Sequence, residues 1–218
     1  MNALAPWVIV GCGYTGERVA SLCRDQGAPV TVTAREPMRA RWLAQTLGVA
    51  AHALDVFDVS ANFGWIPPDA IVVDSVPPGP GRPPHQERLV AKARRAGARR
   101  IVYLSATGVY PPGDGGWVDE DTPVGPVGER GAARLAAEAA LFAAAARVGL
   151  EAVSLRIAAI YGSGRGAKER VAAGTHRVAG AGDNIDDASR PGAPLAPSIW
   201  VSRIHVDDLA ACVWAAGT

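Results

Sequence analysis

The stretch Trp7–Gly16, WVIVGCGYTG, decides the fold of this chain. Four apolar residues, which are typical of a buried strand, lead directly into Gly11, Gly13 and Gly16 in the spacing GxGxxG, and a helical pattern follows. In this context the first glycine permits a tight turn, the second lets the backbone approach a pyrophosphate, and the third allows the helix to pack closely on the strand. The pattern therefore predicts a dinucleotide site at the N-terminus of the helix.

The rest of the chain repeats the alternation of strand and helix. The expected buried strands are Trp7–Val10, Val30–Thr33, Ala50–Leu54, Ala70–Asp74, Arg100–Leu104 and Ala152–Leu155. The expected helices are Glu17–Gln26, Pro37–Leu47, Pro84–Ala96, Glu129–Val148 and Val206–Ala216, the first four each followed by a glycine that would stop them. This order predicts an α/β fold, a doubly wound parallel sheet with helices on both faces.

Two parts of unequal size are expected. Residues 1–156 would form a dinucleotide-binding domain, and residues 157–218 a small, partial substrate region whose last helix packs back on the core. Between Gly162 and Ser202 the composition turns to glycine, proline and small polar residues, so we expect a loosely structured excursion there. The loops Val76–Pro84 and Tyr110–Gly128 follow the fourth and fifth strands, and we expect both to rim the site.

Composition limits the partners. The 22 basic and 21 acidic residues give a net charge of +1, so no global field would attract nucleic acid or an anionic membrane. The three cysteines form no CxxC pair and no histidine spacing resembles a metal cage, so we expect no metal and a reduced, cytoplasmic compartment. No apolar stretch approaches the roughly 18 residues of a membrane span.

The end of the second strand bears on the choice of dinucleotide. An NAD site usually ends this strand in an acidic residue, but here the strand ends in Ala34 and Arg35, with no carboxylate to repel a phosphate. Arg35 could pair with a 2′-phosphate, which favours NADP and leaves NAD as the alternative, or it could be a solvated residue at a helix start. Asp55 could bond adenine or cap the next turn. Further expected cofactor contacts are Tyr14, Thr15, Ser75 and Val76.

Six segments in order resemble the extended short-chain dehydrogenase/reductases, the superfamily of nucleotide-sugar epimerases, dehydratases and reductases. These segments are GCGYTG at Gly11–Gly16, YLSATGVY at Tyr103–Tyr110, DEDTP at Asp119–Pro123, RLAAE at Arg134–Glu138, LRIAAIYGSGR at Leu155–Arg165 and RIHVDDLA at Arg203–Ala210. The resemblance spans nearly the whole chain. It implies a Rossmann fold and an NADP-binding oxidoreductase or epimerase that acts on a carbonyl or nucleotide-sugar-like substrate.

The hydroxyl that the resemblance implies in the active site is displaced. The family pattern places a serine or threonine four residues before Tyr110, where it bonds the reacting oxygen of the substrate, and this chain has Ala106 there. Ser105 and Thr107 flank that position, so either hydroxyl is a candidate to orient the substrate. Tyr110 is itself a candidate acid, and its other interpretation is a packed wall of the site.

The catalytic YxxxK pair of the family is missing. The resemblance aligns Arg130 with the tyrosine and Arg134 with the lysine. A guanidinium is not appreciably neutral near pH 7 and only donates hydrogen bonds, so Arg130 cannot be a general base but could stabilise developing negative charge. Arg134 could still hold the ribose or a phosphate of the cofactor. This pattern resembles the atypical subgroup of the superfamily, in which the nucleotide fold persists without the tyrosine.

Two functions and one assembly remain as hypotheses. The chain would be either an enzyme for an unidentified small-molecule substrate, or an NADP-sensing regulatory or binding protein without turnover. A homodimer through the helices Pro84–Ala96 and Glu129–Val148 is also expected. Its basis is a strip of small side chains at helical spacing, which could instead pack on the sheet of its own chain. The strip consists of Ala136, Ala139, Ala140, Ala143 and Ala144.

Overall fold

The chain forms one open sheet of six parallel strands, in the order β3-β2-β1-β4-β5-β6. The computed structural model describes residues 3–79, 81–111, 116–125, 128–166 and 202–218, with residues 169, 172 and 174. The strands are β1 (Trp7–Val10), β2 (Val30–Ala34), β3 (Ala50–Ala53), β4 (Ile71–Asp74), β5 (Arg100–Ala106) and β6 (Glu151–Ile157). The predicted doubly wound parallel sheet is confirmed.

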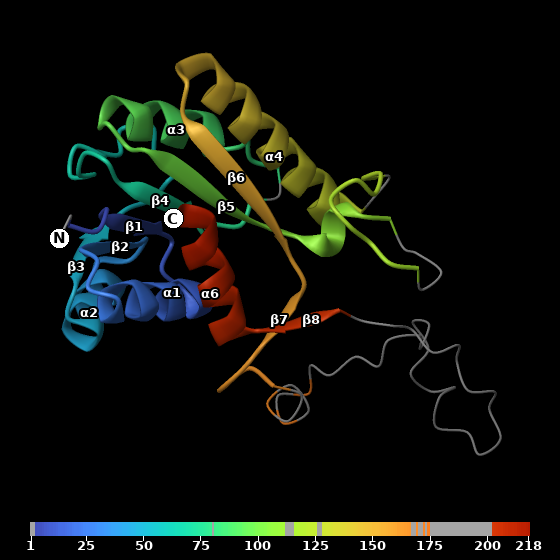
Figure 1. The fold of residues 1–218 in the computed structure, drawn as a ribbon, viewed down its shortest axis with the longest axis horizontal. Helices are drawn as coiled ribbons and strands as arrows, with labels where there is room; N and C mark the ends of the chain where they lie inside the picture. The colour runs from blue at the N-terminus through green and yellow to red at the C-terminus, as the bar shows by residue number, and fades with distance from the viewer. Residues whose placement is uncertain are drawn as a thin grey trace.

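Helices cover both faces of the sheet (Figure 1). They are α1 (Tyr14–Asp25), α2 (Pro37–Leu47), α3 (Gln86–Arg95), α4 (Glu129–Val148), α6 (Val206–Gly217) and the short 3₁₀ helix η1 (Thr107–Val109). Trp7 and Ile9 of β1 pack with α1, α2 and α6, whereas Val8 and Val10 pack with α3 and α4. Two apolar layers therefore enclose the sheet, because successive strand residues point to opposite faces.

The element boundaries follow the local signals with small shifts. Gly48 follows the end of α2 and Gly149 follows the end of α4, and both adopt the left-handed conformation that glycine allows without strain. Helix α1 begins at Tyr14 rather than Glu17, directly after the second glycine of the motif. Helix α3 begins at Gln86 rather than Pro84, with His85 as its N-cap.

The C-terminal residues add a feature that the sequence did not reveal. The short strands β7 (Ala159–Tyr161) and β8 (Arg203–His205) pair in parallel as a separate two-stranded sheet. Helix α6 follows β8 and packs on the main sheet, where the Trp214 ring stacks on the Trp7 ring at 5.1 Å. The predicted domain division after residue 156 stays a prediction, and most of the expected excursion between Gly162 and Ser202 lies outside the described residues.

The alanine strip of α4 is mostly exposed. Ala136, Ala139 and Ala143 lie on the solvent side, as does the half-exposed ring of Phe142, whereas Ala144 is buried against the core. The strip as a whole therefore does not pack on its own sheet. The homodimer stays a prediction. None of the described helices is long and apolar enough to cross a membrane.

Candidate functional site

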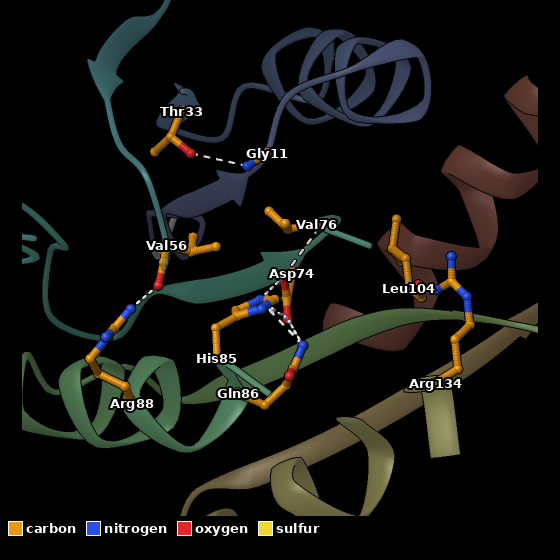
Figure 2. Close-up of polar contacts among 10 residues, drawn as sticks. All are labelled: Gly11, Thr33, Val56, Asp74, Val76, His85, Gln86, Arg88, Leu104 and Arg134. Carbon is orange, nitrogen blue, oxygen red and sulfur yellow. Dashed lines mark hydrogen bonds and ion pairs between the residues drawn. The ribbon is translucent and has the colours of Figure 1, made fainter. Parts of the chain in front are cut away.

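The glycine turn is built by close contacts around Gly11. This residue has a φ of +80°, and a side chain on it would meet Cγ2 of Val76 at 2.5 Å. Its N–H donates to Oγ1 of Thr33 at 3.0 Å (Figure 2), which ties the turn to the end of β2. Gly16 faces β1, and a Cβ there would lie 3.2 Å from Cγ2 of Ile9. Glycine is therefore needed at Gly11 for steric reasons, whereas at Gly16 a side chain would be tight against β1.

Gly13 differs from its neighbours because it faces open space. A Cβ at this position would meet no protein atom within 4 Å. Gly13 is also the N-cap of α1, and without a side chain it leaves the amide groups of the first turn uncapped. An uncapped helix N-terminus beside an open backbone surface is suited to an anion, and these features fit the diphosphate of a dinucleotide.

A cleft of about 730 Å³ opens at this turn, along the carboxyl ends of the central strands. We call it the glycine-rich cleft. Of the ten predicted cofactor contacts, all but Gly16 line it: Gly11, Gly13, Tyr14, Thr15, Arg35, Asp55, Ser75, Val76 and Arg134. Residues far apart in sequence thus meet in one cavity of a size suited to a small-molecule site.

The end of the glycine-rich cleft near β2 carries charges of both signs. Arg35 and Arg39 line it, but so does Glu36, whose carboxylate lies 3.3 Å from Nε of Arg35. We expected no carboxylate at this end of the cleft. The strand itself ends without one, but Glu36 at the start of α2 supplies one. Asp55 also lines the cleft, and its Oδ1 caps the following turn by accepting the N–H of Phe57 at 2.9 Å.

Ser105 and Arg134 lie in the wall of the same cleft. Nη1 of Arg134 donates to the carbonyl of Leu104 at 2.9 Å (Figure 2), which fixes the guanidinium beside β5. Ser105 is 2% exposed, and its hydroxyl has no well-formed hydrogen bond within the described part of the chain. Nearby, burial raises the pKa of Tyr103 to about 12 against the opposing charge of Arg134, so this phenol stays neutral.

The other predicted catalytic residues lie elsewhere. Thr107 and Tyr110 line a second cleft of about 900 Å³, which we call the Tyr110 cleft. The Tyr110 hydroxyl donates to the carbonyl of Asp119 at 2.9 Å and accepts from Nη1 of Arg156 at 3.0 Å, so it is engaged in both directions. Arg130 is exposed in the first turn of α4 and lines neither cleft. The structure therefore separates Ser105 from its three proposed catalytic partners, whose roles stay predictions.

A largely buried ion pair that sequence reasoning missed lines the Tyr110 cleft. Glu138 is 4% exposed, and its Oε2 lies 2.9 Å from Nη2 of Arg156. Burial raises the pKa of Glu138, but the hydrogen bonds and the charge of Arg156, together with a hydrogen bond from Ser154, outweigh burial and hold this pKa below its usual value. The one sequence signal for this pair is that Glu138, a charged residue, falls on the apolar side of α4.

The described residues offer no metal cage and no activated thiol near the turn. No group of three or more histidine, cysteine, aspartate or glutamate side chains in this part of the chain could hold a metal ion. Burial raises the pKa of Cys12, within the glycine motif, to about 12. Its thiol therefore stays protonated at neutral pH and is a poor nucleophile.

Comparisons with known proteins identify the family and agree with the fold. The family model described as "NAD dependent epimerase/dehydratase family" matches residues 85–218. A conserved protein of unknown function from Silicibacter pomeroyi is similar in structure, with 26% identity, a TM-score of 0.71 and coverage of 98% of this chain and 68% of that one. No curated protein matches the chain significantly.

Two further structures carry more informative names. A protein from Methylobacillus flagellatus assigned as an NAD-dependent epimerase/dehydratase shares 27% identity, with a TM-score of 0.72 over 98% of this chain and 70% of that one. UDP-glucuronic acid 4-epimerase from Bacillus cereus, solved with UDP-glucuronic acid and NAD, shares 16% identity, with a TM-score of 0.69 over 97% and 72% of the two chains. At that identity the second likeness concerns the fold alone.

Proposed function

Because the chain belongs to the NAD-dependent epimerase/dehydratase family of extended short-chain dehydrogenase/reductases, we propose that it binds NADP(H) in the glycine-rich cleft and acts on a carbonyl or nucleotide-sugar-like substrate. The observation that carries the proposal is Gly13, whose open backbone adjoins the uncapped start of α1 inside a cleft of about 730 Å³. Hydride transfer is the chemistry that a bound nicotinamide would supply.

Two arginines support NADP rather than NAD. Arg35 is largely exposed and lines the cleft at the end of β2, so its guanidinium can turn toward a 2′-phosphate. Arg39 lines the same end of the cleft and adds positive charge there, with its guanidinium paired with Glu17 and lying over the ring of Trp42. Glu36 is the residue that would instead favour NAD, because a carboxylate can accept hydrogen bonds from the ribose hydroxyls. Substitutions of Arg35 and Glu36 can therefore test whether the site prefers NADP or NAD.

We expect Arg35→Ala to weaken NADP binding at least tenfold and to leave NAD binding nearly unchanged. One charge-assisted phosphate contact contributes roughly 1.5 to 3 kcal/mol, and about 1.4 kcal/mol corresponds to a factor of ten in affinity. Titration calorimetry with both dinucleotides measures the effect. Glu36→Gln is the matched control, because it removes the neighbouring charge and should not weaken NADP binding. Equal affinities of the parent for both dinucleotides, or a selective loss of NAD binding in Glu36→Gln, would contradict the assignment.

Ser105 and Arg134 line the cleft, and we propose that they are the groups that would act on a substrate. The buried Ser105 hydroxyl would donate a hydrogen bond to the reacting oxygen, and the fixed Arg134 guanidinium would stabilise negative charge there or hold the nicotinamide ribose. Neither group accepts a proton readily near pH 7, so water or the substrate would carry the proton. A site of this kind predicts slow turnover without the pH profile of a titrating tyrosine.

For an active enzyme, Ser105→Ala should lower kcat by about 10²- to 10³-fold, the usual effect of losing one preorganised donor. NADP affinity should change little. Initial rates of cofactor turnover with aldehydes, ketones and nucleotide sugars provide the assay, and Thr107→Ala serves as control because Thr107 lines the other cleft. A larger loss in Thr107→Ala or in Tyr110→Phe would move the reacting centre to the Tyr110 cleft.

The absence of a tyrosine base favours a second candidate, a protein that binds NADP(H) and responds to it without turnover. The resemblance aligns Arg130 and Arg134 with the YxxxK pair, and a guanidinium only donates hydrogen bonds, so neither can act as a general base. The same assay separates the two functions. Tight NADP(H) binding without turnover of any substrate class would favour the sensor.

A further inference from the structure

Three polar side chains are buried together where the end of β4 meets the start of α3 (Figure 2). Asp74 and Gln86 are fully buried and His85 is 4% exposed. Nε2 of His85 lies 3.0 Å from both carboxylate oxygens of Asp74, and the Gln86 amide donates to Oδ2 at 2.9 Å. Because a carboxylate only accepts hydrogen bonds, His85 must donate here, and the buried charge is compensated by these donors.

The Asp74 carboxylate also bonds a segment that lines the glycine-rich cleft. Oδ1 of Asp74 also accepts the backbone N–H of Val76 at 3.2 Å. Val76, with Ser75 and Pro77, lines the glycine-rich cleft, and its side chain fills the space where a Cβ of Gly11 would stand. Asp74 therefore holds this segment against the glycine turn, although Asp74 itself does not line the cleft in the described part of the chain.

The start of α3 also braces a second segment of the cleft. The Arg88 guanidinium donates to the carbonyl of Val56 (Figure 2), and the ring of Phe57 packs edge-on against the His85 ring at 5.2 Å. Val56 and Phe57 line the cleft as well. One turn of helix thus contacts two cleft segments that follow different strands, β3 and β4.

From these contacts we propose that Asp74, His85 and Gln86 are positioning residues for the cofactor, which act by fixing the segment Ser75–Pro77 against the glycine turn. This role rests on the proposed NADP(H) binding. A purely stabilising role accounts poorly for the cluster, because apolar side chains of similar volume often stabilise a core as well as a buried charged network does. A polar cluster, unlike an apolar one, can also bond the amide of Val76 directly and so specify where the segment lies.

The test compares cofactor affinity with stability in three near-isosteric variants. Asp74→Asn should weaken NADP(H) binding at least tenfold, because an amide cannot accept from all of the present donors at once. His85→Phe keeps the aromatic contact with Phe57 and should weaken binding several-fold. Gln86→Met removes one donor at constant volume and should have the smallest effect, about threefold. Calorimetry gives the affinities, thermal unfolding gives Tm, and hydrogen exchange of the Val76 amide in the cofactor-free protein should be faster in each variant.

Leu141→Ala is the matched control. Leu141 is fully buried on α4, in the apolar layer that α3 and α4 form on this face of the sheet, and it does not line the cleft. It should lower Tm as much as the variants do and keep NADP(H) affinity within twofold. The positioning role would be overturned if NADP(H) affinity fell in proportion to Tm in the three variants and the control alike. It would also be overturned if the exchange rate of the Val76 amide did not change. A parent that binds no dinucleotide would overturn the proposed function and this role together, whereas a binding parent with unaffected variants would overturn this role alone. Gln86→Met keeps the test decisive if Asp74→Asn does not fold.

Discussion

Gly13→Asp is expected to weaken dinucleotide binding more than a hundredfold and to leave the free energy of unfolding unchanged or slightly higher. The open space around Gly13 admits a side chain without a clash, and aspartate is a better N-cap than glycine by a few tenths of a kcal/mol. The new carboxylate would accept hydrogen bonds from the same amide groups of α1 that would bind a diphosphate. Its charge would also repel the phosphates, by about 4 kcal/mol for unit charges 4 Å apart near a protein surface.

Gly13→Asn separates the two causes of this loss. Asparagine is nearly isosteric with aspartate and caps a helix equally well, but it carries no charge. We expect it to weaken binding by a smaller factor, and the ratio of the two affinities should fall as salt is added. Calorimetry and urea denaturation measure binding and stability on the same samples. A Gly13→Asp variant that binds NADP(H) as tightly as the parent would show that the diphosphate does not lie at this turn.

The second large effect concerns the buried pair of Glu138 and Arg156. Arg156→Met should lower the free energy of unfolding by about 3 kcal/mol at pH 7, the lower end of the range for breaking a buried ion pair, because Arg156 is itself partly exposed. The cost arises because Glu138 would stay buried and charged without its cation. Arg156→Met combined with Glu138→Gln should recover much of the loss, since a neutral amide needs no counter-charge.

The pH dependence of this variant has a defined sign. In the parent, the pKa of Glu138 lies below its usual value, so the pair stabilises the fold above the unfolded pKa and this contribution is lost as pH falls through the folded pKa. Without Arg156 burial dominates and raises the pKa of Glu138, so its charged form destabilises the fold at neutral pH. The difference in stability between parent and variant should therefore shrink from pH 7 to pH 4.

Urea denaturation at several pH values measures this difference. Arg147→Met is the control, because Arg147 pairs with Glu87 on the surface, where both side chains are more than half exposed. Its stability should change little and show no such convergence toward low pH. A constant difference between Arg156→Met and the parent across the pH range would mean that Glu138 does not carry the effect.

The order of the elements could be predicted from the sequence because it depends on local patterns. The apolar run before Gly11 and the spacing of the three glycines specify a strand, a turn and a helix within ten residues. Gly48 and Gly149 mark helix ends by a conformational preference that belongs to the residue itself. The resemblance likewise located the missing YxxxK pair by alignment, which needs no coordinates.

Tertiary structure alone decided which side chains meet. Ser105 and Thr107 are two residues apart, yet β5 buries Ser105 in the glycine-rich cleft and η1 carries Thr107 into the Tyr110 cleft. Glu138 and Arg156 are separated by 18 residues and come from a helix and a strand that pack on each other.

Asp74 meets His85 and Gln86 only because α3 returns to the end of β4 after a proline-rich loop. Periodicity indicates that a residue is buried, but the partner of a buried charge is set by the packing of whole elements. That packing results from many weak contacts between distant parts of the chain, so a short stretch of sequence cannot predict it. The sequence therefore determined the fold and the glycine turn, and the packing determined which polar groups surround it.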